Sequence, residues 1–303
     1  MKILFLDHSY HKQTKSNEWI LDILTQLGDV EIRWDDSWNP QSKTPVKLDD
    51  VLSFDLVVVW QVWATAILCA RKGVKNMVVG LMFDSMWGDC DVHELLPHKM
   101  LCPCEQLYND LQVQGFNNLF YTRYMPKPSE KPITDFETIR PFIWQRRTIP
   151  SWQTAIQLLQ KTPYESLTLK MNPDPGSSIQ PPTPIDCENH RIKMINGWLP
   201  EYEFNALLDS QNLYFAPRTA EGLGFSFVDA MARGIPVIGY DQATMNEYII
   251  SGYSGHLYSN PQPIEGLTTS TLKKWSQNTL TIVEAGHEQW LNDIEILKQF
   301  IIT

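Results

Sequence analysis

The sequence predicts an α/β protein made of two doubly wound, Rossmann-like domains. Short apolar runs such as Asp55–Trp60 alternate with segments of helical periodicity. The length of 303 residues suits two cores of ordinary size. Met125–Ile133, MPKPSEKPI, has three prolines among polar residues, which is typical of a linker. The expected boundaries are 1–124 for the first domain, 125–138 for the linker, 139–270 for the second domain and 271–303 for a C-terminal helical segment.

The first domain is expected to hold five or six parallel strands. Strands buried on both faces of a parallel sheet are unbroken apolar runs, and alternation of strands with helices implies parallel pairing through right-handed crossovers. Apolar residues at helical spacing predict a helix over Glu18–Leu27. The predicted strands are Lys2–Leu6, Val30–Trp34, Asp55–Trp60, Asn76–Phe83, Met100–Leu107 and Asn118–Tyr124.

Polar residues that directly follow these strands are candidate ligand contacts, because ligands gather at the carboxyl ends of strands in an open parallel sheet. His8, Ser9 and Tyr10 follow the first strand, and Asp84 follows the fourth. A structural hydrogen bond is the alternative role for His8. An N-cap of the next segment is the alternative for Asp84.

The second domain is expected to begin near Ile139. Asn172–Pro184, with five prolines and no periodicity, predicts a long surface loop. The predicted strands are Pro141–Trp144, Ser166–Met171, Arg191–Ile195, Leu213–Ala216 and Ile235–Ile238. The predicted helices are Trp152–Leu159, Pro200–Asp209, one that begins at Ser226, and Lys273–Phe300.

Cations close two strands of the second domain. Arg146 and Arg147 end one strand, and Lys170 lies near the end of the next. Arginine is a planar, bidentate donor to phosphate, so these positions are candidates for an anion site. The alternative for the arginine doublet is a solvated basic turn.

The most informative stretch is Asn212–Tyr240, which reads as strand, glycine turn, helix and strand. Gly222 and Gly224 immediately precede the helix that begins at Ser226. Helix N-termini present N–H groups and positive dipole ends, and glycine lets an anion approach the backbone. The stretch therefore predicts a phosphate-bearing ligand.

Glu221 precedes these glycines and Asp229 follows eight residues later. This arrangement resembles the acid-x7-acid donor motif of retaining GT-B glycosyltransferases (glycosyl transferases group 1, family 4-like), with Asp229 in place of the usual glutamate. The resemblance implies a GT-B fold, whose two domains face a cleft and whose terminal helix often crosses back onto the first domain. Ser226 and Asp229 also form an S-x-x-D capping box, which alone would explain an acid at 229.

The resemblance implies an enzyme that moves a sugar from a nucleoside diphosphate to a hydroxyl acceptor, such as a glycan or lipid-linked glycan, with retention of configuration. Fixed cations would neutralise the diphosphate, so no cofactor and no metal are expected. The implied catalytic residues are Glu221 and Asp84, the acceptor-side residues are His8, Ser9 and Tyr10, and the donor-binding residues are Arg146, Arg147, Lys170, Gly222, Leu223, Gly224, Phe225, Ser226 and Asp229.

Two other functions are consistent with the same features. One is another nucleotide-sugar enzyme of this architecture, such as an epimerase or a phage enzyme that glucosylates DNA. The other is a catalytically inactive nucleotide-sugar-binding module. The net charge of −10 disfavours nucleic acid as a main partner.

The remaining composition predicts a cytoplasmic protein, with the inner face of a membrane as a second setting. No run approaches the length of a membrane span, and the N-terminal apolar run is too short for a signal peptide. Five cysteines, an odd number with irregular spacing, predict thiols rather than disulfides. A zinc site is the alternative for the cluster Cys90, His93, His98, Cys102 and Cys104.

Overall fold

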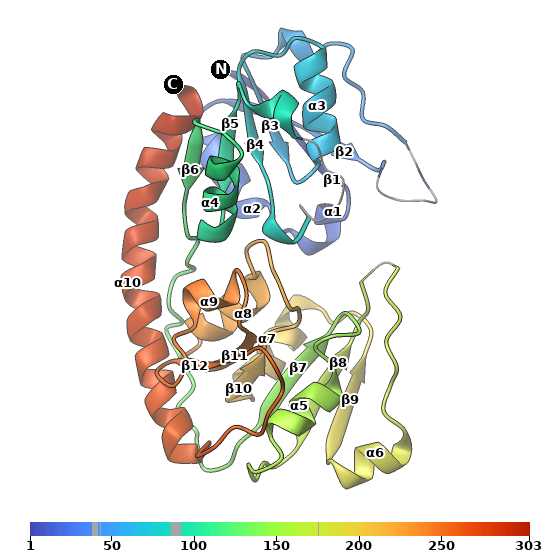
Figure 1. The fold of residues 1–303 in the computed structure, drawn as a ribbon, viewed down its shortest axis with the longest axis vertical. Coiled ribbons are helices and arrows are strands. Elements are labelled where there is room, and N and C mark those ends of the chain that lie inside the picture. Colours follow the sequence, from blue (N-terminus) through green and yellow to red (C-terminus); the bar gives the residue numbers. More distant parts are fainter. Residues whose placement is uncertain (38–41, 43, 86–91, 175) are drawn as a thin grey trace. The chain divides into compact units, whose positions relative to one another are not determined.

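The computed structural model describes residues 1–37, 42, 44–85, 92–174 and 176–303 (Figure 1). The chain forms two compact units, which are unit 1 (Met1–Tyr124 with Gln289–Thr303) and unit 2 (Met125–Glu288). Each unit contains a six-stranded parallel sheet with helices, so the predicted fold class is confirmed. Helix α10 (Thr269–Ile302) begins in unit 2 and ends in unit 1.

The sheet of unit 1 has the strand order β2-β1-β3-β4-β5-β6. The order reverses after β2, so the switch point of the sheet lies between β1 and β3. The strands are β1 (Lys2–His8), β2 (Asp29–Asp35), β3 (Leu56–Trp60), β4 (Met77–Gly80), β5 (Lys99–Cys102) and β6 (Leu119–Tyr121). The helices are α1 (His11–Thr14), α2 (Glu18–Thr25), α3 (Trp63–Arg71) and α4 (Glu105–Val113), with 3-10 turns η1 (Val51–Ser53), η2 (Phe83–Ser85) and η3 (His93–Leu95).

Three predicted strands of unit 1 are too long. The run Asn118–Tyr124 forms a strand only over Leu119–Tyr121. The run Met100–Leu107 stops being a strand at Cys102, because α4 begins at Glu105 and the Cys104 sulfur accepts a hydrogen bond from Leu107 N at 3.5 Å. The run Asn76–Phe83 pairs only as far as Gly80, and its last residue enters η2. After β4 and after β5, the apolar run continues past the strand because its residues remain buried in the segment that follows.

The end of α10 packs onto unit 1. The Trp290 ring contacts the rings of Trp19 and Tyr124, at centroid distances of 5.3 and 5.5 Å. Lys99 Nζ donates to the carbonyl of Ile301 at 3.0 Å, so a cation satisfies one of the last carbonyls of the helix. Buried aromatic contacts and a helix C-cap therefore hold this terminal segment.

The sheet of unit 2 has the order β12-β11-β10-β7-β8-β9. The predicted strands are all present within one or two residues, and β12, a four-residue strand that the sequence does not signal, completes the sheet. The strands are β7 (Pro141–Gln145), β8 (Leu167–Met171), β9 (Ile192–Asn196), β10 (Leu213–Phe215), β11 (Val237–Tyr240) and β12 (Gly255–Tyr258). The helices are α5 (Trp152–Leu158), α6 (Pro184–Asn189), α7 (Glu201–Asp209), α8 (Phe225–Ala232), α9 (Met245–Tyr248) and the first part of α10.

Alternate residues of β7 pack against different helices. Phe142 and Trp144 contact Phe204 of α7, at centroid distances of 6.2 and 5.4 Å. Ile143 points to the other face, where it shares a core with Trp152 of α5 and with the start of α10. The sheet is thus covered on both faces, as its apolar strands require.

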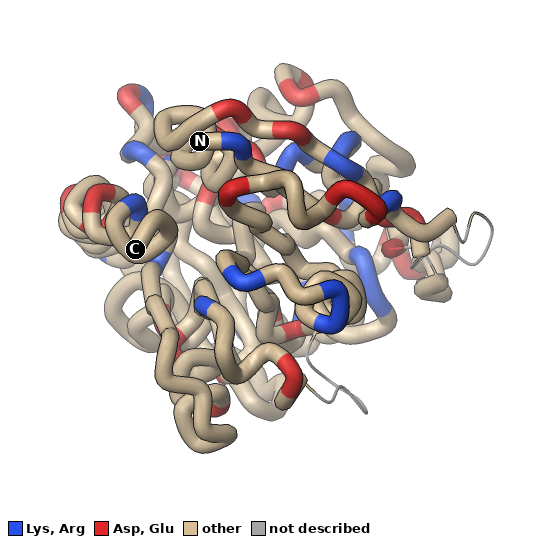
Figure 2. Tube along the Cα trace, turned by 90° about the horizontal axis from the view of Figure 1, so that it is seen from above, with Lys and Arg blue, Asp and Glu red and all other residues tan. Residues whose placement is uncertain are grey.

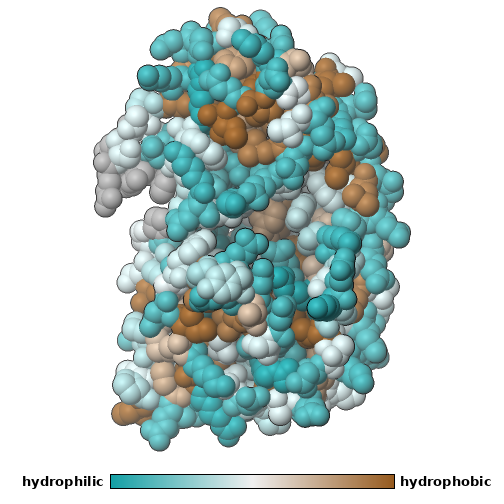
Figure 3. All heavy atoms as spheres, turned by 180° about the vertical axis from the view of Figure 1, so that it is seen from behind, coloured by the Kyte–Doolittle hydropathy of each residue, from teal (hydrophilic) through white to brown (hydrophobic). Residues whose placement is uncertain are grey.

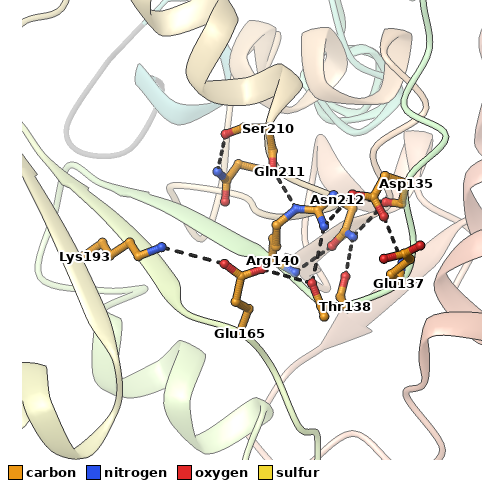
Figure 4. A network of polar contacts seen from close by, with 9 residues as sticks. All are labelled: Asp135, Glu137, Thr138, Arg140, Glu165, Lys193, Ser210, Gln211 and Asn212. Atoms are coloured by element: carbon orange, nitrogen blue, oxygen red, sulfur yellow. Dashed lines mark hydrogen bonds and ion pairs between the residues drawn. The ribbon is translucent and has the colours of Figure 1, made fainter.

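The amino-terminal edge of this sheet is tied to the linker through Asn212 (Figure 4). The fully buried Asn212 amide accepts from Arg140 N at 2.7 Å and donates to the carbonyls of Thr138 and Asp135 at 2.7 and 3.1 Å. The Arg140 guanidinium donates to Ser210 O at 2.8 Å. These bonds fix the starts of β7 and β10, whose other ends carry the candidate site.

Acidic and basic residues are interspersed along the trace in Figure 2. Hydrophilic groups cover most of the face in Figure 3, with hydrophobic groups in smaller areas. None of the described helices has the length and apolar character needed to cross a bilayer. Cys69, Cys102 and Cys104 are buried thiols and Cys187 is half-buried, whereas Cys90 lies outside the described residues. In the described part of the chain, no three His, Cys, Asp or Glu side chains group as a metal site would require.

Candidate functional site

The switch point of unit 2 lies between β7 and β10. From β7 the chain adds β8 and β9 on one side, and then returns to place β10 on the other side. Loops that leave the carboxyl ends of β7 and β10 therefore part in opposite directions, which opens a ligand-binding crevice in sheets of this kind. The predicted donor-binding residues lie at the ends of β7 and β8, in the loop after β10 or in the first two turns of α8, elements that are labelled in Figure 1.

Three arginines converge here on one buried carboxylate, that of Asp174. Arg146 donates to Asp174 Oδ1 through Nε and Nη2, both at 2.8 Å. Arg147 Nε and Arg218 Nη2 approach Oδ2 at 3.1 and 2.7 Å. Burial opposes ionisation of Asp174, but the charges of Arg146 and Arg218 outweigh it and lower its pKa. The arginine doublet is therefore part of a charged cluster rather than a solvated turn, although Arg147 itself is half-exposed.

Lys170 occupies a separate position beside this cluster. Its side chain is 2% exposed, and Nζ has no hydrogen-bond partner among the described residues. The ammonium lies 4.2 Å from the ring centroid of Trp144, and 5.8 and 5.9 Å from those of Trp198 and Phe204. Burial, followed by the charge of Arg146, lowers the pKa of Lys170 to about 8. Both cations face the indole of Trp144, since the Arg146 guanidinium lies 5.1 Å from it.

Helix α8 begins one residue earlier than the sequence predicts, and the capping-box alternative is wrong. Its N-cap is Gly224, at φ +70°, and no side chain caps the helix, so Ser226 and Asp229 lie inside its first two turns. Glycine is required at 224 because a Cβ there would lie 1.9 Å from the buried ring of Phe227. The first amides of the helix thus face the carboxyl edge of the sheet.

Glu221 is held at this edge through its backbone. Its N–H donates to Ala243 O at 3.1 Å, and its carbonyl accepts from the buried Thr244 hydroxyl at 2.8 Å. The side chain is buried, with Oε2 3.9 Å from Arg218 Nη1. The loop after β11 therefore positions Glu221 next to the arginine cluster.

Asp229 lies in α8 with a half-buried side chain. Burial raises its pKa to about 6, against the opposing charge of Arg233. The Arg233 guanidinium donates to the backbone carbonyl of Asp229 at 3.0 Å, and its other contacts are with Asp209 and Asn205. Because Asp229 does not cap the helix, its role at this edge is open to ligand binding. Its pKa lies close to neutral pH, which is common among residues of functional sites.

The predicted acceptor-side residues lie at the carboxyl end of β1 in unit 1. The buried Asp7 carboxylate approaches His11 Nδ1 at 2.9 Å and accepts from Asn17 Nδ2 at 2.6 Å, which ties down the loop after β1. His8 ends the strand, and burial followed by the charge of His11 lowers its pKa to about 4. The Tyr10 amide donates to His8 Nδ1 at 3.3 Å, so the structural hydrogen bond predicted as an alternative is present.

Asp84 lies in η2, just beyond β4, and residues 86–91 of the segment that it would cap lie outside the described residues. Strand β3 separates β4 from β1, so Asp84 and His8 share one edge of the sheet without being on adjacent strands. In unit 2 the sequence interpretation missed Asp174, Arg218 and Thr244. Each of the first two follows a predicted strand within a few residues, which was the available signal.

Part of the chain matches a known protein family in sequence. The family described as Glycosyl transferases group 1 matches residues 189–274, which span β9 to the start of α10. This match includes Glu221, the glycine turn and Asp229. No curated protein matches the chain in sequence.

Solved structures resemble the whole chain. Sucrose-phosphate synthase from Thermosynechococcus elongatus superposes with a TM-score of 0.69 at 13% identity, covering 99% of this chain and 98% of that one. Anabaena HepE, in complex with UDP and glucose, has a TM-score of 0.66 at 13% identity, covering 99% and 100%. The lipopolysaccharide outer core galactosyltransferase WaaB has a TM-score of 0.64 at 13% identity, covering 98% and 100%. At this identity the similarity establishes the GT-B fold.

Proposed function

We propose that this chain, which has the GT-B fold and matches Glycosyl transferases group 1 over residues 189–274, transfers a sugar from a nucleoside diphosphate to a hydroxyl acceptor with retention of configuration. The observation that carries the proposal is the convergence of Arg146, Arg147 and Arg218 at the switch point of unit 2, beside the N-terminus of α8. Cations and helix amides at one strand edge are what a diphosphate requires.

The charges at this edge suit a diphosphate. Arg146, Arg147, Arg218 and Lys170 supply four positive charges, while Asp174, Glu221 and, above about pH 6, Asp229 supply three negative ones. The edge thus keeps an excess of positive charge for a nucleoside diphosphate sugar, which carries about two negative charges. The same cations would stabilise the charge that develops on the leaving diphosphate, so we propose that no metal takes part.

We assign roles to the acids by position. Glu221, buried next to Arg218 and held by Thr244, would accept hydrogen bonds from the sugar hydroxyls and stabilise positive character at the anomeric carbon. Asp229 would accept from the ribose hydroxyls when it is ionised. The exposed Trp198, next to the Lys170 site, would offer a stacking surface for the base.

The acceptor would bind at the carboxyl edge of the unit 1 sheet, near His8, Ser9, Tyr10 and Asp84. The low pKa of His8 keeps it neutral at pH 7, so it would serve as a hydrogen-bond partner and not as a cation. Asp84 would position the acceptor hydroxyl or accept its proton. A glycan or lipid-linked glycan supplies such a hydroxyl.

Ligand binding and donor cleavage test the proposal. A thermal-shift panel of UDP, GDP, dTDP and ADP identifies the base, and release of nucleoside diphosphate from the matching sugar donors measures turnover. Glu221→Ala is expected to lose turnover by about 100-fold or more and nucleotide affinity by less than about tenfold, because its contacts are to the sugar. Glu188→Ala, an exposed acid on α6, is the matched control.

Full turnover in Glu221→Ala would remove that residue from the mechanism. Nucleotide binding without donor cleavage, with or without acceptors, would instead indicate a catalytically inactive nucleotide-sugar-binding module. Failure to bind any of the four nucleotides would refute the proposal.

A further inference from the structure

Asp174 lies at the centre of the arginine cluster, and the roles assigned above leave it without one. Its carboxylate joins guanidiniums that come from the loop after β7 and from the loop after β10. Its backbone is also fixed, because its N–H donates to Arg146 O and its carbonyl accepts from Ser177 N, both at 2.9 Å. A side chain that is 7% exposed therefore links the two sides of the switch point.

The distribution of bonds over the two oxygens keeps the cations together. Oδ1 accepts both bonds from Arg146, and Oδ2 accepts from Arg147 and Arg218. Three guanidiniums that share one carboxylate repel one another, and long arginine side chains lose rotamer freedom when they are held in place. Without a shared anion they would spread toward solvent. A carboxylate offers guanidinium the same kind of oxygen acceptors as a phosphate, so Asp174 can hold the three guanidiniums together.

We propose that Asp174 is a positioning residue for the donor diphosphate, which keeps Arg146 and Arg218 converged at the switch point before the nucleotide binds. The inference deepens the proposed function and rests on it. Its ligand is any nucleoside diphosphate, since bonds from guanidinium groups to phosphate do not depend on the base.

The two possible roles of Asp174 predict opposite changes in diphosphate affinity when its charge is removed. The negative charge of Asp174 by itself opposes a diphosphate, so removing it makes the site more positive. If Asp174 acted only through its charge, its loss would tighten diphosphate binding. If it preorganises the arginines, its loss weakens binding, because ordering three side chains must then accompany association.

Asp174→Asn separates these possibilities, since asparagine keeps the size of the side chain and removes its charge. Calorimetry would measure the nucleoside diphosphate that most stabilises the wild-type protein, and also the matching nucleoside. We expect the diphosphate to bind about tenfold or more weakly, as the loss of one or two charge-assisted contacts implies. The nucleoside should bind within about twofold of wild type, because it does not reach the cluster. A role of Asp174 in folding alone would not discriminate between the two ligands.

Two further variants serve as controls. Asp174→Glu restores the charge on a longer arm and should recover part of the lost affinity. Asp135→Asn removes the partner of Arg140 at the opposite edge of the same sheet and should leave both affinities unchanged. If Asp174→Asn does not fold, the double variant Asp174→Asn/Arg147→Gln removes one cation together with the carboxylate. It relieves the repulsion and is compared with Arg147→Gln alone, relative to which it is expected to show the same selective loss.

The inference would be overturned, and the proposed function left intact, if Asp174→Asn bound the diphosphate as tightly as the wild type or more tightly. If only the double variant folds, the same outcome relative to Arg147→Gln would overturn it. A wild-type protein that binds no nucleoside diphosphate more tightly than its nucleoside would overturn both.

Discussion

Replacing Lys170 with methionine is expected to stabilise unit 2 and to weaken nucleotide binding. The ammonium is buried against Trp144, Trp198 and Phe204, with no hydrogen-bond partner among the described residues. Methionine matches the unbranched lysine stem, and its sulfur packs well against aromatic rings. The variant therefore keeps the packing and removes a buried charge, whose only compensation in the described structure is the faces of those rings.

The magnitude follows from the pKa. A fall from 10.5 to about 8 corresponds to about 3 kcal/mol in favour of the neutral amine. The cation–π attraction between the ammonium and the aromatic rings is lost in the variant and offsets part of this, so the expected gain is about 1–2 kcal/mol at pH 7. Between pH 8 and 10.5 the unfolded state binds more protons than the folded state, so the wild type gains stability as pH rises. The advantage of Lys170→Met is thus full below pH 8 and disappears near pH 10.5.

Thermal unfolding of both proteins from pH 6.5 to 10.5 measures this difference. For a unit of this size, about 1–2 kcal/mol corresponds to a rise in Tm of about 2–8 °C at pH 7. The control is Lys193→Met, an exposed lysine on the adjacent strand β9, which should change Tm little at any pH. A lower Tm for Lys170→Met at pH 7, or a difference independent of pH, would refute the reasoning. Nucleoside diphosphate affinity should fall in the same variant, since its positive charge is proposed to serve the donor.

Three other substitutions test separate parts of unit 2. Asp229→Asn should raise the free energy of unfolding at pH 7.5 by about 1–2 kcal/mol, because a folded pKa of about 6 means that burial of the ionised carboxylate destabilises the fold above pH 6. This gain, read as a higher Tm, should vanish near pH 4, and the variant should bind nucleotide more weakly. Gly224→Ala should cost about 2–4 kcal/mol in unfolding experiments, whereas Gly252→Ala, at φ +77° with open space around it, should cost about 1 kcal/mol. Asn212→Ala should destabilise by about 1–3 kcal/mol in denaturant titrations, since it leaves part-buried backbone groups of the linker without the Asn212 amide as a partner, and an unchanged midpoint would contradict that role.

The order of strands and helices was predictable because buried parallel strands and amphipathic helices leave periodic apolar patterns in the sequence. Boundaries were less predictable. Burial continues from β5 into α4, so the apolar pattern alone does not mark where the strand ends at Cys102. Strand β12 has four residues, GHLY, and no unbroken apolar run to signal it.

The candidate site was predictable where a residue directly follows a strand, as with Arg146 and Arg147. The link from Arg218 to Asp174 spans 44 residues, and no local pattern encodes which loops meet at a switch point. The capping-box interpretation failed for a conformational reason, since Gly224 takes a left-handed φ and becomes the N-cap itself. That shift leaves Asp229 within the helix, where its raised pKa is a consequence of tertiary burial that the sequence does not report.

The two groups of the proposed donor site whose pKa values are shifted are expected to confine its pH range together. In its proposed role, Asp229 accepts from ribose hydroxyls only after it loses its proton, above about pH 6. In its proposed role, Lys170 attracts phosphate only while it keeps its proton, below about pH 8. Nucleotide affinity is therefore expected to be greatest between about pH 6 and pH 8. In the pH profile of affinity, Asp229→Asn should remove the fall on the acidic side and Lys170→Met the fall on the basic side. His8 cannot supply the acidic limb, because its pKa of about 4 leaves it neutral throughout this range.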